Sequence, residues 1–577
     1  MLEKIKTPKD VKKISLNNLP KLATEMRAAL LNRVSKIGGH VGPNFGSVEA
    51  TIALHYVFNC PIDKIIYDVS HQCYSHKLLT GRAYGFLNDK DFCKISGYTD
   101  PSESEYDMFN IGHTSTSISL AIGVAKARDL QRQKYNVIAF IGDGSLSGGE
   151  ALEGLNACNE LHSNFIIVLN DNDMCISENH GGLYNHLAEL RESKGTAKNN
   201  IFKAFGYDYL YVDNGNNIKD LVIAFKKAKK ATRPIVVHIK TTKGKGLKFA
   251  EQNKETWHFK MPFNPKTGKL LNSISNAYPP IITEYLLNKA KYDPKVLVVS
   301  AATPGSFGLF EKQRKQLGKQ YIDVGIAEET AAAVCSGCAK NGGKPIWPVP
   351  ASFINRTYDQ ISQDICLNKS PVAVIVNTSG IYGFKDKTHL GIFDIPFLSS
   401  IPNLSYIAPT TKQEFLKAVD YAIDQNEKPV FIKTPGYVIE GKKCIKDFSK
   451  IKYEVNQKGK KVAFIGLGIF YPLAKQAAKL YKQKTGITPT LINPYFVTDL
   501  DVKTLNSLKK DHSIVVTIED GILQSGFGSN IASHFGSSNI KVFNYGYKKE
   551  FIDRFNIEVI LKENHITPQQ IVKDILE

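Results

Sequence analysis

Short runs of apolar residues recur along the chain and alternate with longer stretches that have the spacing of helices. The runs are rich in valine and isoleucine and cover residues 137–141, 165–169, 235–239, 296–299, 372–376, 462–467 and 514–518. Runs of this length and composition are typical of parallel strands that are buried on both faces. Because helical stretches separate them, we expect helices to cover both sides of each sheet. The pattern therefore predicts an α/β protein with mainly parallel sheets.

The strands fall into three groups along a chain of 577 residues, which is too long for a single hydrophobic core. The first group predicts a domain over residues 1–262. A linker over 263–291 follows, because it begins in a stretch that contains proline, lysine and asparagine. A second domain is expected over 292–440 and, after a lysine-rich connection, a third over 453–577.

The chain has 74 lysines and arginines against 55 aspartates and glutamates, which gives a formal net charge of +19. A basic balance can indicate nucleic acid, a membrane surface or anionic substrates. The lysines recur singly and in pairs, and no block of five or six like charges marks a nucleic-acid-binding tail. No stretch approaches the roughly 20 apolar residues of a membrane-spanning helix. We therefore expect a basic surface with no nucleic-acid partner and no membrane partner.

The nine cysteines have no framework spacing, so reduced thiols are the simplest interpretation. Cys335 and Cys338 form a lone C-x-x-C in a run of helical spacing, and no second pair follows at the spacing of a zinc site. The first residues lack the apolar core of an export signal. Together these features predict a cytoplasmic protein.

The strongest local signal lies at the ends of two neighbouring predicted strands. Gly142-Asp143-Gly144 follows the run 137–141, and after 25 intervening residues Asn170-Asp171-Asn172 follows the run 165–169. Open α/β sheets bind their ligands at the carboxyl ends of parallel strands. The glycines let the backbone approach an anion, and Asp143 and Asn172 offer the oxygen ligands that Mg²⁺ prefers beside a diphosphate.

This pair of motifs resembles the signature of thiamine-diphosphate enzymes, whose cofactor diphosphate is held through a divalent metal. Further segments resemble 1-deoxy-D-xylulose-5-phosphate synthase, in the order of that family, over residues from about 20 to 535. These segments are Gly38-Gly-His40-Val-Gly42, Tyr67-Asp-Val-Ser-His71-Gln-Cys-Tyr-Ser-His76-Lys77, Gly112-His113-Thr-Ser-Thr-Ser117, Lys243-Gly-Lys-Gly246, Asp323-Val-Gly-Ile-Ala-Glu328, Ser352-Phe353-Ile-Asn-Arg356-Thr-Tyr358-Asp359-Gln360 and Thr388-His389.

The resemblance implies a diphosphate-binding, a pyrimidine-binding and a C-terminal domain, in the order of the three predicted domains, with thiamine diphosphate and Mg²⁺ as cofactors. It implies that Asp143, Asn172 and the carbonyl of Met174 hold the metal. The remaining cofactor-binding residues that it implies are His71, Gly112, His113, Thr114, Gly144, Ser145, Lys243, Glu328 and Phe353. Among these, Phe353 matches the aromatic residue that stacks on the aminopyrimidine ring.

Glu328 matches the glutamate that shares a proton with the aminopyrimidine ring. A carboxyl group in an apolar pocket has a raised pKa, which suits proton sharing. Glu328 also opens the helical run Ala327-Glu-Glu-Thr-Ala-Ala, where a first-turn glutamate complements the helix dipole. Both interpretations can hold, and the surrounding match favours catalysis.

His40, His71, His258 and His389 match family positions around the reacting carbons. Imidazoles can supply proton transfers near neutral pH. A single histidine is more often a structural hydrogen-bonding group, but each of these lies within a matching motif, and His40 and His389 are the best candidates. His113 could equally be structural.

Several positions depart from the family pattern, and they cluster on the side of the acceptor substrate. The family carries a segment close to DRAGLVGADGPTH, which corresponds to residues 377–389 here. Thr378 takes the place of an arginine that grips the aldehyde phosphate, and Lys385 takes the place of an aspartate. Residues 433–436, Lys-Thr-Pro-Gly, replace an Arg-Tyr-Pro-Arg-Gly run.

Arginine binds phosphate with two parallel hydrogen bonds, whereas lysine acts only as a point charge. Lys385, Lys387 and Lys433 can rebuild a phosphate site of weaker geometry. The candidate substrate residues are Arg356, Lys385 and Lys433. Alternatively, the two-carbon unit is joined to another acceptor. A degenerate paralogue is a third possibility, against which the intact cofactor set argues.

The resemblance implies a transferase of the transketolase type that decarboxylates pyruvate and condenses the two-carbon unit with glyceraldehyde 3-phosphate to give 1-deoxy-D-xylulose 5-phosphate. That product would feed isoprenoid and thiamine biosynthesis, and the family implies a homodimer. The rivals are a transketolase that releases no carbon dioxide, a related carboligase with a different acceptor, a non-catalytic binding protein on the same scaffold, and a nucleic-acid binder suggested by the charge.

Overall fold

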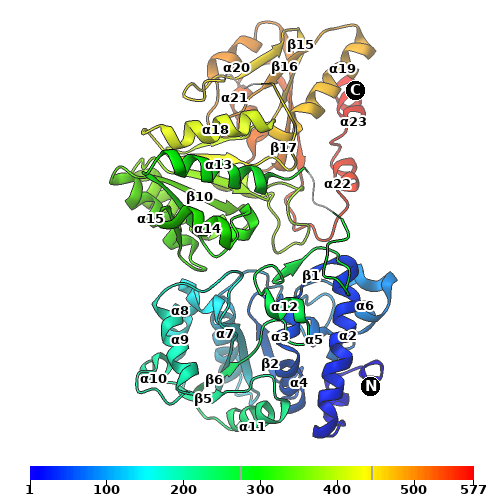
Figure 1. The fold of residues 1–577 in the computed structure, drawn as a ribbon. Coiled ribbons are helices and arrows are strands. Elements are labelled where there is room, and N and C mark those ends of the chain that lie inside the picture. The colour runs from blue at the N-terminus through cyan, green and yellow to red at the C-terminus, as the bar shows by residue number, and fades with distance from the viewer. Residues whose placement is uncertain (273–275, 443–445) are drawn as a thin grey trace. The chain divides into compact units, whose positions relative to one another are not determined.

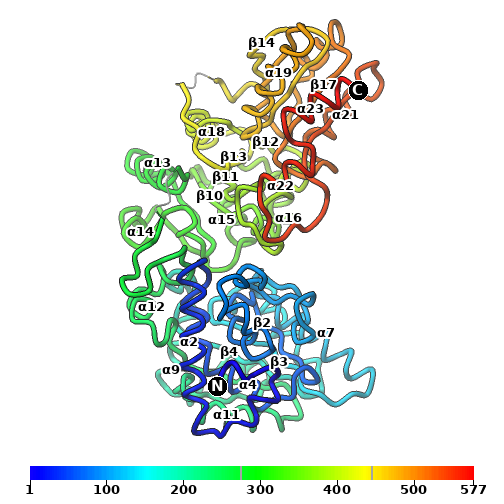
Figure 2. The backbone as a smooth tube through the Cα atoms, turned by 90° about the vertical axis from the view of Figure 1, so that its right-hand side faces the viewer, coloured from blue at the N-terminus to red at the C-terminus, as the bar shows by residue number. Residues whose placement is uncertain are grey.

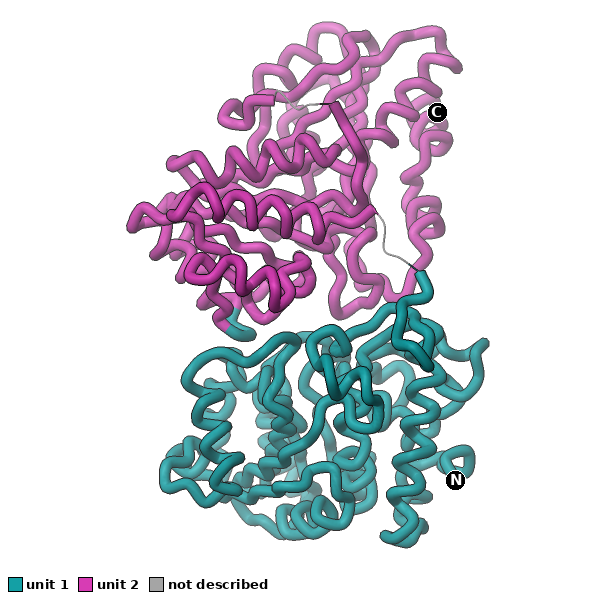
Figure 3. The backbone as a smooth tube through the Cα atoms, viewed as in Figure 1, with its two compact units in different colours: residues 1–274, 325–327 teal, residues 275–324, 328–577 magenta. Residues whose placement is uncertain are grey.

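The computed structural model describes residues 1–272, 276–442 and 446–577. The chain forms two compact units (Figure 3). Unit 1 comprises residues 1–274 and 325–327, and unit 2 comprises residues 275–324 and 328–577. Three sheets that are mainly parallel, each covered by helices, form the two units, so the predicted α/β class is confirmed (Figure 1).

Unit 1 is built on a five-stranded parallel sheet with the strand order β2-β3-β4-β6-β5. Its strands are β2 (Lys64–Tyr67), β3 (Val137–Gly142), β4 (Phe165–Asp171), β5 (Asp208–Val212) and β6 (Pro234–Lys240). A separate antiparallel pair joins β1 (Gly39–His40) to β7 (Phe259–Lys260). The carboxyl ends of β3 and β4 therefore lie side by side, as the two motifs at Asp143 and Asn172 required.

Helices cover both faces of this sheet because successive side chains of a strand point to opposite faces. Ile138 and Phe140 of β3 pack with α2 and α4, whereas Ala139 and Ile141 pack with α7 and α8. The helices of unit 1 are α1 (Pro8–Lys12), α2 (Leu19–Ile37), α3 (Gly42–Gly46), α4 (Val48–Val57), α5 (Tyr74–Leu79), α6 (Tyr84–Leu87), α7 (Ser117–Leu130), α8 (Gly149–Cys158), α9 (Gly182–Glu192), α10 (Ile201–Ala204), α11 (Ile218–Ala228) and α12 (Lys248–Gln252).

Unit 2 contains two sheets. The first is parallel with the order β12-β13-β11-β10-β8-β9, and the second has the order β14-β16-β15-β17-β18 with only β14 antiparallel. The strands are β8 (Val296–Ser300), β9 (Tyr321–Asp323), β10 (Lys344–Pro350), β11 (Ala373–Asn377), β12 (Ser405–Ile407), β13 (Val430–Lys433), β14 (Glu454–Gln457), β15 (Lys461–Gly466), β16 (Thr490–Asn493), β17 (His512–Ile522) and β18 (Lys541–Tyr547). Figure 2 lets the reader follow the backbone through both sheets.

One continuous hydrophobic core joins the two sheets of unit 2, since Ile346 and Val374 of the first belong to the same cluster as Ile465 and Val515 of the second. The helices of unit 2 are α13 (Tyr278–Tyr292), α14 (Glu311–Leu317), α15 (Glu328–Lys340), α16 (Tyr358–Gln360), α17 (Asp394–Ser399), α18 (Lys412–Asp424), α19 (Tyr471–Thr485), α20 (Val502–Leu508), α21 (Phe527–Phe535), α22 (Ile557–Glu563) and α23 (Pro568–Leu576). The division of the chain into three domains stays a prediction.

The predicted linker over 263–291 is wrong in its last part, because residues from Tyr278 onward form helix α13. Ile282, Leu286 and Ala290 recur every four residues and lie buried in the core of unit 2. The prolines after Tyr278 are compatible with a helix because they occupy its first turn, where no backbone donor is needed. Residues 273–275 of the predicted linker lie outside the described residues.

The eight cysteines that the structure describes are free thiols, as predicted, and Cys444 lies outside the described residues. Cys335 and Cys338 are on helix α15. Across residues 1–272, 276–442 and 446–577, the helices are all too short or too polar to cross a membrane.

The burial of α13 predicts how the chain responds to truncation of its side chains. Leu286 is fully buried, so Leu286→Ala should lower the free energy of unfolding by about 2–5 kcal/mol through lost apolar contact and a residual cavity. Glu284→Ala on the exposed face of the same helix should change it by less than about 0.5 kcal/mol. Urea denaturation of both variants measures the difference, and equal small effects would show that this segment is a loose connection.

Candidate functional site

Three of the predicted catalytic histidines lie together in unit 1. The ring centroids of His40 and His71 are 5.0 Å apart, and His258 lies 5.5 Å from His40 and 5.2 Å from His71. His40 ends strand β1, which pairs with β7 directly after His258, and the Val41 amide donates a hydrogen bond to the His258 carbonyl at 3.1 Å. The antiparallel pair thus brings together residues that are far apart in the sequence.

A buried amide that the sequence analysis missed fixes the loops that carry two of these histidines. The Asn44 Nδ2 group donates to the His40 carbonyl and to the His71 carbonyl, each at 2.7 Å. Its Oδ1 atom accepts from the Tyr74 amide at 2.9 Å. Asn44 is fully buried, and these three hydrogen bonds use both its donor hydrogens and its acceptor. Its position two residues after Gly42, just beyond the end of a matching motif, was the available signal.

Lys243 is buried beside these histidines. Its ammonium group donates to the Cys175 carbonyl, and burial lowers the pKa of Lys243 to about 8. Desolvation holds the pKa of His258 well below its ordinary value, and the nearby Lys243, His71 and His40 lower it further. The cluster therefore keeps a neutral imidazole next to a cation that is available for an anionic ligand.

The residues predicted to hold the metal follow strands β3 and β4. Asp143 is buried, and burial together with the neighbouring Asp171 raises the pKa of the Asp143 carboxyl. Its Oδ2 atom accepts from the Met174 amide at 3.0 Å and from Asn179 Nδ2 at 2.9 Å. These contacts bring the Met174 backbone close to Asp143 through its amide, and the metal ligation predicted for the Met174 carbonyl stays a prediction.

The donor set fits a hard divalent cation. The Oδ1 atom of Asn172 is buried and, within the described residues, has no hydrogen-bond partner. An orphaned buried amide oxygen and a buried carboxylate of raised pKa, each at the end of one of two neighbouring strands, are groups that a cation would stabilise. No cluster of three or more histidine, cysteine, aspartate or glutamate side chains that could hold a metal occurs in the described part of the chain. The predicted site instead combines one carboxylate, one amide and one carbonyl.

The turns expected to receive the diphosphate pack tightly. A Cβ atom on Gly144 would lie 2.9 Å from the Cys175 sulfur, so only glycine fits here. The Ser145 carbonyl accepts a hydrogen bond from Ser115 Oγ at 2.8 Å, which ties its turn to the loop of Gly112, His113 and Thr114 that leads into α7.

Asp68 is a second residue that the sequence analysis missed. Its buried carboxylate accepts from the Ser115 amide at 2.8 Å and the Ser117 amide at 3.0 Å, so it holds the start of α7 in place. Asp68 directly follows strand β2 within a quoted motif, and that position was its signal. Ser115 has a φ of 75°, an uncommon backbone conformation that these hydrogen bonds maintain.

Glu328, in unit 2, opens helix α15 as predicted and is 4% exposed. Burial raises the pKa of its carboxyl to about 7, although the Arg356 guanidinium lies 3.7 Å from Oε2 and opposes the rise. Within the described residues, Oε2 is buried without a hydrogen-bond partner. A carboxyl that is half protonated near neutral pH can give or take a proton.

Phe353 and His389, also in unit 2, lie against each other. Their rings form an edge-to-face contact with centroids 5.5 Å apart, and Phe384 makes a second such contact with His389. The Nδ1 atom of His389 lies 3.2 Å from Asp386 Oδ1 and 2.9 Å from Thr388 Oγ1. The structure thus brings a predicted stacking residue and a predicted catalytic histidine together.

The candidate substrate residues do not share one environment. Lys433 is buried, and its ammonium group donates to Asp394 Oδ2 at 2.6 Å, where Tyr406 also donates. Lys385 is exposed, and Arg356 faces Glu328. Lys433 therefore already has a structural partner, and a phosphate site made of these three residues stays a prediction.

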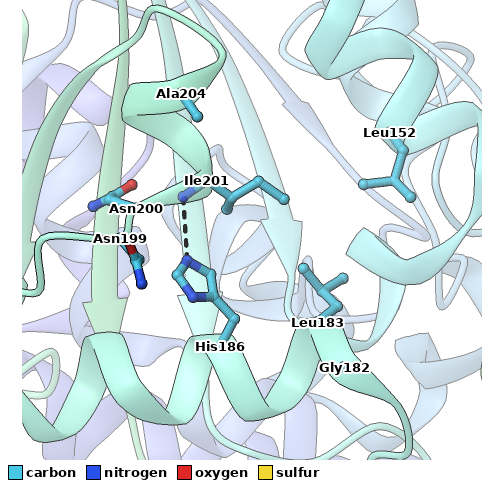
Figure 4. A pocket seen from close by; sticks show the side chains of 8 residues that line it. All are labelled: Leu152, Gly182, Leu183, His186, Asn199, Asn200, Ile201 and Ala204. Carbon is cyan, nitrogen blue, oxygen red and sulfur yellow. Dashed lines mark hydrogen bonds between the residues drawn. The ribbon is translucent and has the colours of Figure 1, made fainter.

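An open pocket of about 520 Å³ also lies in unit 1, between α8, α9 and α10 (Figure 4). His186 of α9 accepts a hydrogen bond from the Ile201 amide there, and Leu152 and Leu183 line the wall. None of the residues predicted to bind cofactor or substrate lines this pocket.

Family models match the chain in three consecutive segments. Residues 2–200 match a model described as 1-deoxy-D-xylulose-5-phosphate synthase, residues 277–436 the pyrimidine-binding domain of transketolase, and residues 451–571 the transketolase C-terminal domain. A transketolase from Leishmania mexicana has a TM-score of 0.44 and 16% identity over 97% of both chains, a likeness too weak to carry an argument. The fold and the matches define a transketolase-like α/β protein.

Curated relatives narrow this class. The chain is 36% identical to a 1-deoxy-D-xylulose-5-phosphate synthase of Caldanaerobacter subterraneus subsp. tengcongensis, covering 100% of this chain and 99% of the relative. It is 37% identical to the enzyme of the same name from Clostridium acetobutylicum over 98% of both chains, and 35% identical to that of Listeria monocytogenes over 100% and 97%. The chain belongs to the 1-deoxy-D-xylulose-5-phosphate synthase family, whose members are thiamine-diphosphate-dependent transferases that use a divalent metal.

The three hydrogen bonds of Asn44 predict a specific effect of removing its amide. Asn44→Ala should lower the free energy of unfolding by about 1–3 kcal/mol, since two buried carbonyls lose their donor. The loosened loops of His40 and His71 should also weaken binding of thiamine diphosphate with Mg²⁺ about tenfold, measured by calorimetry. Asn217→Ala is the matched control, because it removes a helix N-cap amide of similar stabilising value on α11. Equal cofactor affinity in both variants would contradict the role given to Asn44.

The raised pKa of Glu328 predicts a pH-dependent stability. The pKa rises from an ordinary value of 4.5 to about 7, so the stabilising contribution is full below pH 4.5 and is lost as pH rises toward 7. The loss amounts to about 3 kcal/mol. Glu328→Gln cannot ionise and should gain stability relative to the parent chain between about pH 5 and pH 8 in thermal unfolding without cofactor. Glu284→Gln, at an exposed site, should keep a constant difference; a constant difference for Glu328→Gln as well would rule out the buried ionisation.

Proposed function

We propose that this chain decarboxylates pyruvate and condenses the two-carbon unit with glyceraldehyde 3-phosphate to give 1-deoxy-D-xylulose 5-phosphate. The observation that carries the proposal is Glu328, a buried carboxyl at the start of α15 with a pKa of about 7, in a chain whose full-length relatives carry the name of this synthase. A structural glutamate in a first helical turn has no need of such burial, because an exposed carboxylate interacts with the helix dipole equally well.

The residues of unit 1 supply the anion and metal contacts in this proposal. Asp143, Asn172 and the Met174 carbonyl hold Mg²⁺, and Lys243 offers a buried cation to the diphosphate. Thiamine diphosphate, when bound, supplies a nucleophilic carbon and accepts the electrons released when carbon dioxide leaves. His258 of the histidine cluster lies near Lys243, and tight packing at Gly144 excludes side chains from the diphosphate turn.

The titratable groups divide the proton transfers. Glu328 would share its proton with the aminopyrimidine nitrogen of the bound cofactor, a role that its pKa of about 7 suits. His40, His71 and His258 form one cluster of imidazoles that can move protons at the carboxylate and carbonyl oxygens of the keto acid. His389 could transfer protons in the same way, and Phe353, whose ring packs against it, would stack on the pyrimidine ring of the bound cofactor.

We further propose that the active enzyme is a homodimer and that its product feeds isoprenoid and thiamine biosynthesis. Pyruvate, a sugar phosphate and a diphosphate are all anions, which suits a chain with a net charge of +19. Thr378 and Lys385 depart from the family pattern on the side of the acceptor substrate. The experiment therefore varies the acceptor.

The purified chain with thiamine diphosphate, Mg²⁺, labelled pyruvate and glyceraldehyde 3-phosphate should release labelled carbon dioxide and form a five-carbon ketose phosphate. Glu328→Gln should lower kcat by about 100-fold or more, since it removes the shared proton. Glu284→Gln is the matched control and should retain full turnover. If pyruvate were consumed only in the presence of a different aldehyde, glyceraldehyde 3-phosphate would not be the acceptor. Ketol transfer without release of carbon dioxide would favour a transketolase.

A further inference from the structure

The acceptor side of unit 2 carries a carboxylate where the family pattern does not place one. The resemblance expects an aspartate at position 385, which is lysine here, and expects glycine at position 386, which is aspartate. Lys385 is exposed, whereas Asp386 is largely covered by its neighbours. The carboxylate has therefore moved by one residue along the loop that ends at His389.

The displaced carboxylate reaches the catalytic histidine. Asp386 Oδ1 lies 3.2 Å from His389 Nδ1 and 2.5 Å from Thr388 Oγ1, and Thr388 Oγ1 lies 2.9 Å from the same ring nitrogen. The Thr388 amide also donates to Asp386 Oδ1 at 3.1 Å. Carboxylate, hydroxyl and imidazole thus form one closed set of hydrogen bonds around Nδ1.

The charge state of Asp386 decides the direction of these bonds. Burial alone would raise its pKa, but the hydrogen bonds from His389 and Thr388 outweigh burial and lower the pKa of Asp386 to about 2. An ionised carboxylate only accepts hydrogen bonds, so the threonine hydroxyl donates to it and Nδ1 carries a proton. The other ring nitrogen, Nε2, is then the one that can exchange a proton with a ligand.

The surrounding structure holds this arrangement rigid. The Lys387 amide donates to Asp553 Oδ1 at 3.1 Å, and the Arg554 amide donates to the Lys385 carbonyl at 2.6 Å, so a segment near the C-terminus clamps both sides of Asp386. The His389 ring is further packed edge to face by Phe353 and Phe384. Neither ring rotation nor loop motion is free to break the contact without also breaking these.

We propose that Asp386 is a positioning residue for the reaction: it orients His389 and keeps a proton on Nδ1. The imidazolium form can then pass its Nε2 proton to the carbonyl oxygen of the acceptor as the new carbon–carbon bond forms, which leaves a neutral ring protonated at Nδ1. This proposal rests on the proposed function for its chemistry. The carboxylate that contacts His389 thus stands at position 386, whereas the family pattern has its aspartate at position 385.

The test is a double-mutant cycle on the full-length protein with thiamine diphosphate, Mg²⁺, pyruvate and glyceraldehyde 3-phosphate. Asp386→Asn should lower kcat by about 10- to 100-fold. In the His389→Gln background the same substitution should lower kcat by less than about twofold, because Asp386 acts only through the imidazole. An equal loss in both backgrounds would overturn the proposal.

Asp447→Asn is the matched control. Asp447 makes the same turn, accepting from the Ser449 amide at 3.0 Å and from Ser449 Oγ at 2.5 Å, and pairs with Lys450. Its substitution should leave kcat unchanged. If Asp386→Asn lowers the thermal midpoint strongly, Thr388→Val removes the bridging hydroxyl instead and should show the same dependence on His389.

A spectroscopic readout separates this proposal from the proposed function. Protein labelled with ¹⁵N-histidine should show the His389 signal, identified by its loss in His389→Gln, as the tautomer protonated at Nδ1, and Asp386→Asn should change that signal. A wild-type signal from the tautomer protonated at Nε2 would overturn the positioning role even in a fully active enzyme. Absence of carbon dioxide release with an Nδ1-protonated ring would instead defeat only the proposed function.

Discussion

Desolvation of ionisable side chains is the constraint on which the chemistry of this molecule depends. Burial raises the pKa of Glu328 to about 7, lowers that of Lys243 to about 8 and depresses that of His258. Each of these groups can therefore adopt its neutral form near neutral pH, whereas an exposed carboxylate or ammonium group stays charged there. The cost of this burial must be met by the packing around each site, and both units provide it through sheets that helices cover on either face.

Parallel sheets make such burial possible at defined places. Strand β4 is buried along its whole length and strand β3 is buried up to Ile141, and both end at one edge of the sheet, where Asp143 and Asn172 follow. Backbone groups at that edge are satisfied by turns rather than by the ladder, so tight glycine-containing turns and buried hydrogen bonds fix the geometry. The same principle operates in unit 2, where Glu328 opens a helix and Asp386 closes a turn on His389.

Much of the fold could be predicted from local patterns. The apolar runs predicted seven of the eighteen strands in the described residues, because a buried strand needs a short continuous run of apolar, often β-branched, residues. Helix α13 was missed although its apolar residues recur every four positions. The stretch before Tyr278, which contains proline, lysine and asparagine, suggested a linker, and the two prolines after Tyr278 do not interrupt the helix because they lie in its first turn. Asn44 and Asp68 were missed because each acts on backbone groups tens of residues away, which no local pattern encodes.

The sequence by itself determined the α/β class, the strand-end motifs at Asp143 and Asn172 and the catalytic candidate Glu328, because each depends on residue type and spacing within one segment. Only the tertiary structure decided that three histidines converge, that Lys433 is engaged by Asp394, and that Asp386 rather than residue 385 reaches His389. In each case the partners and the burial of a side chain depend on how distant segments, or neighbouring turns, fold against one another. Hydrogen bonds and pKa values follow from that packing.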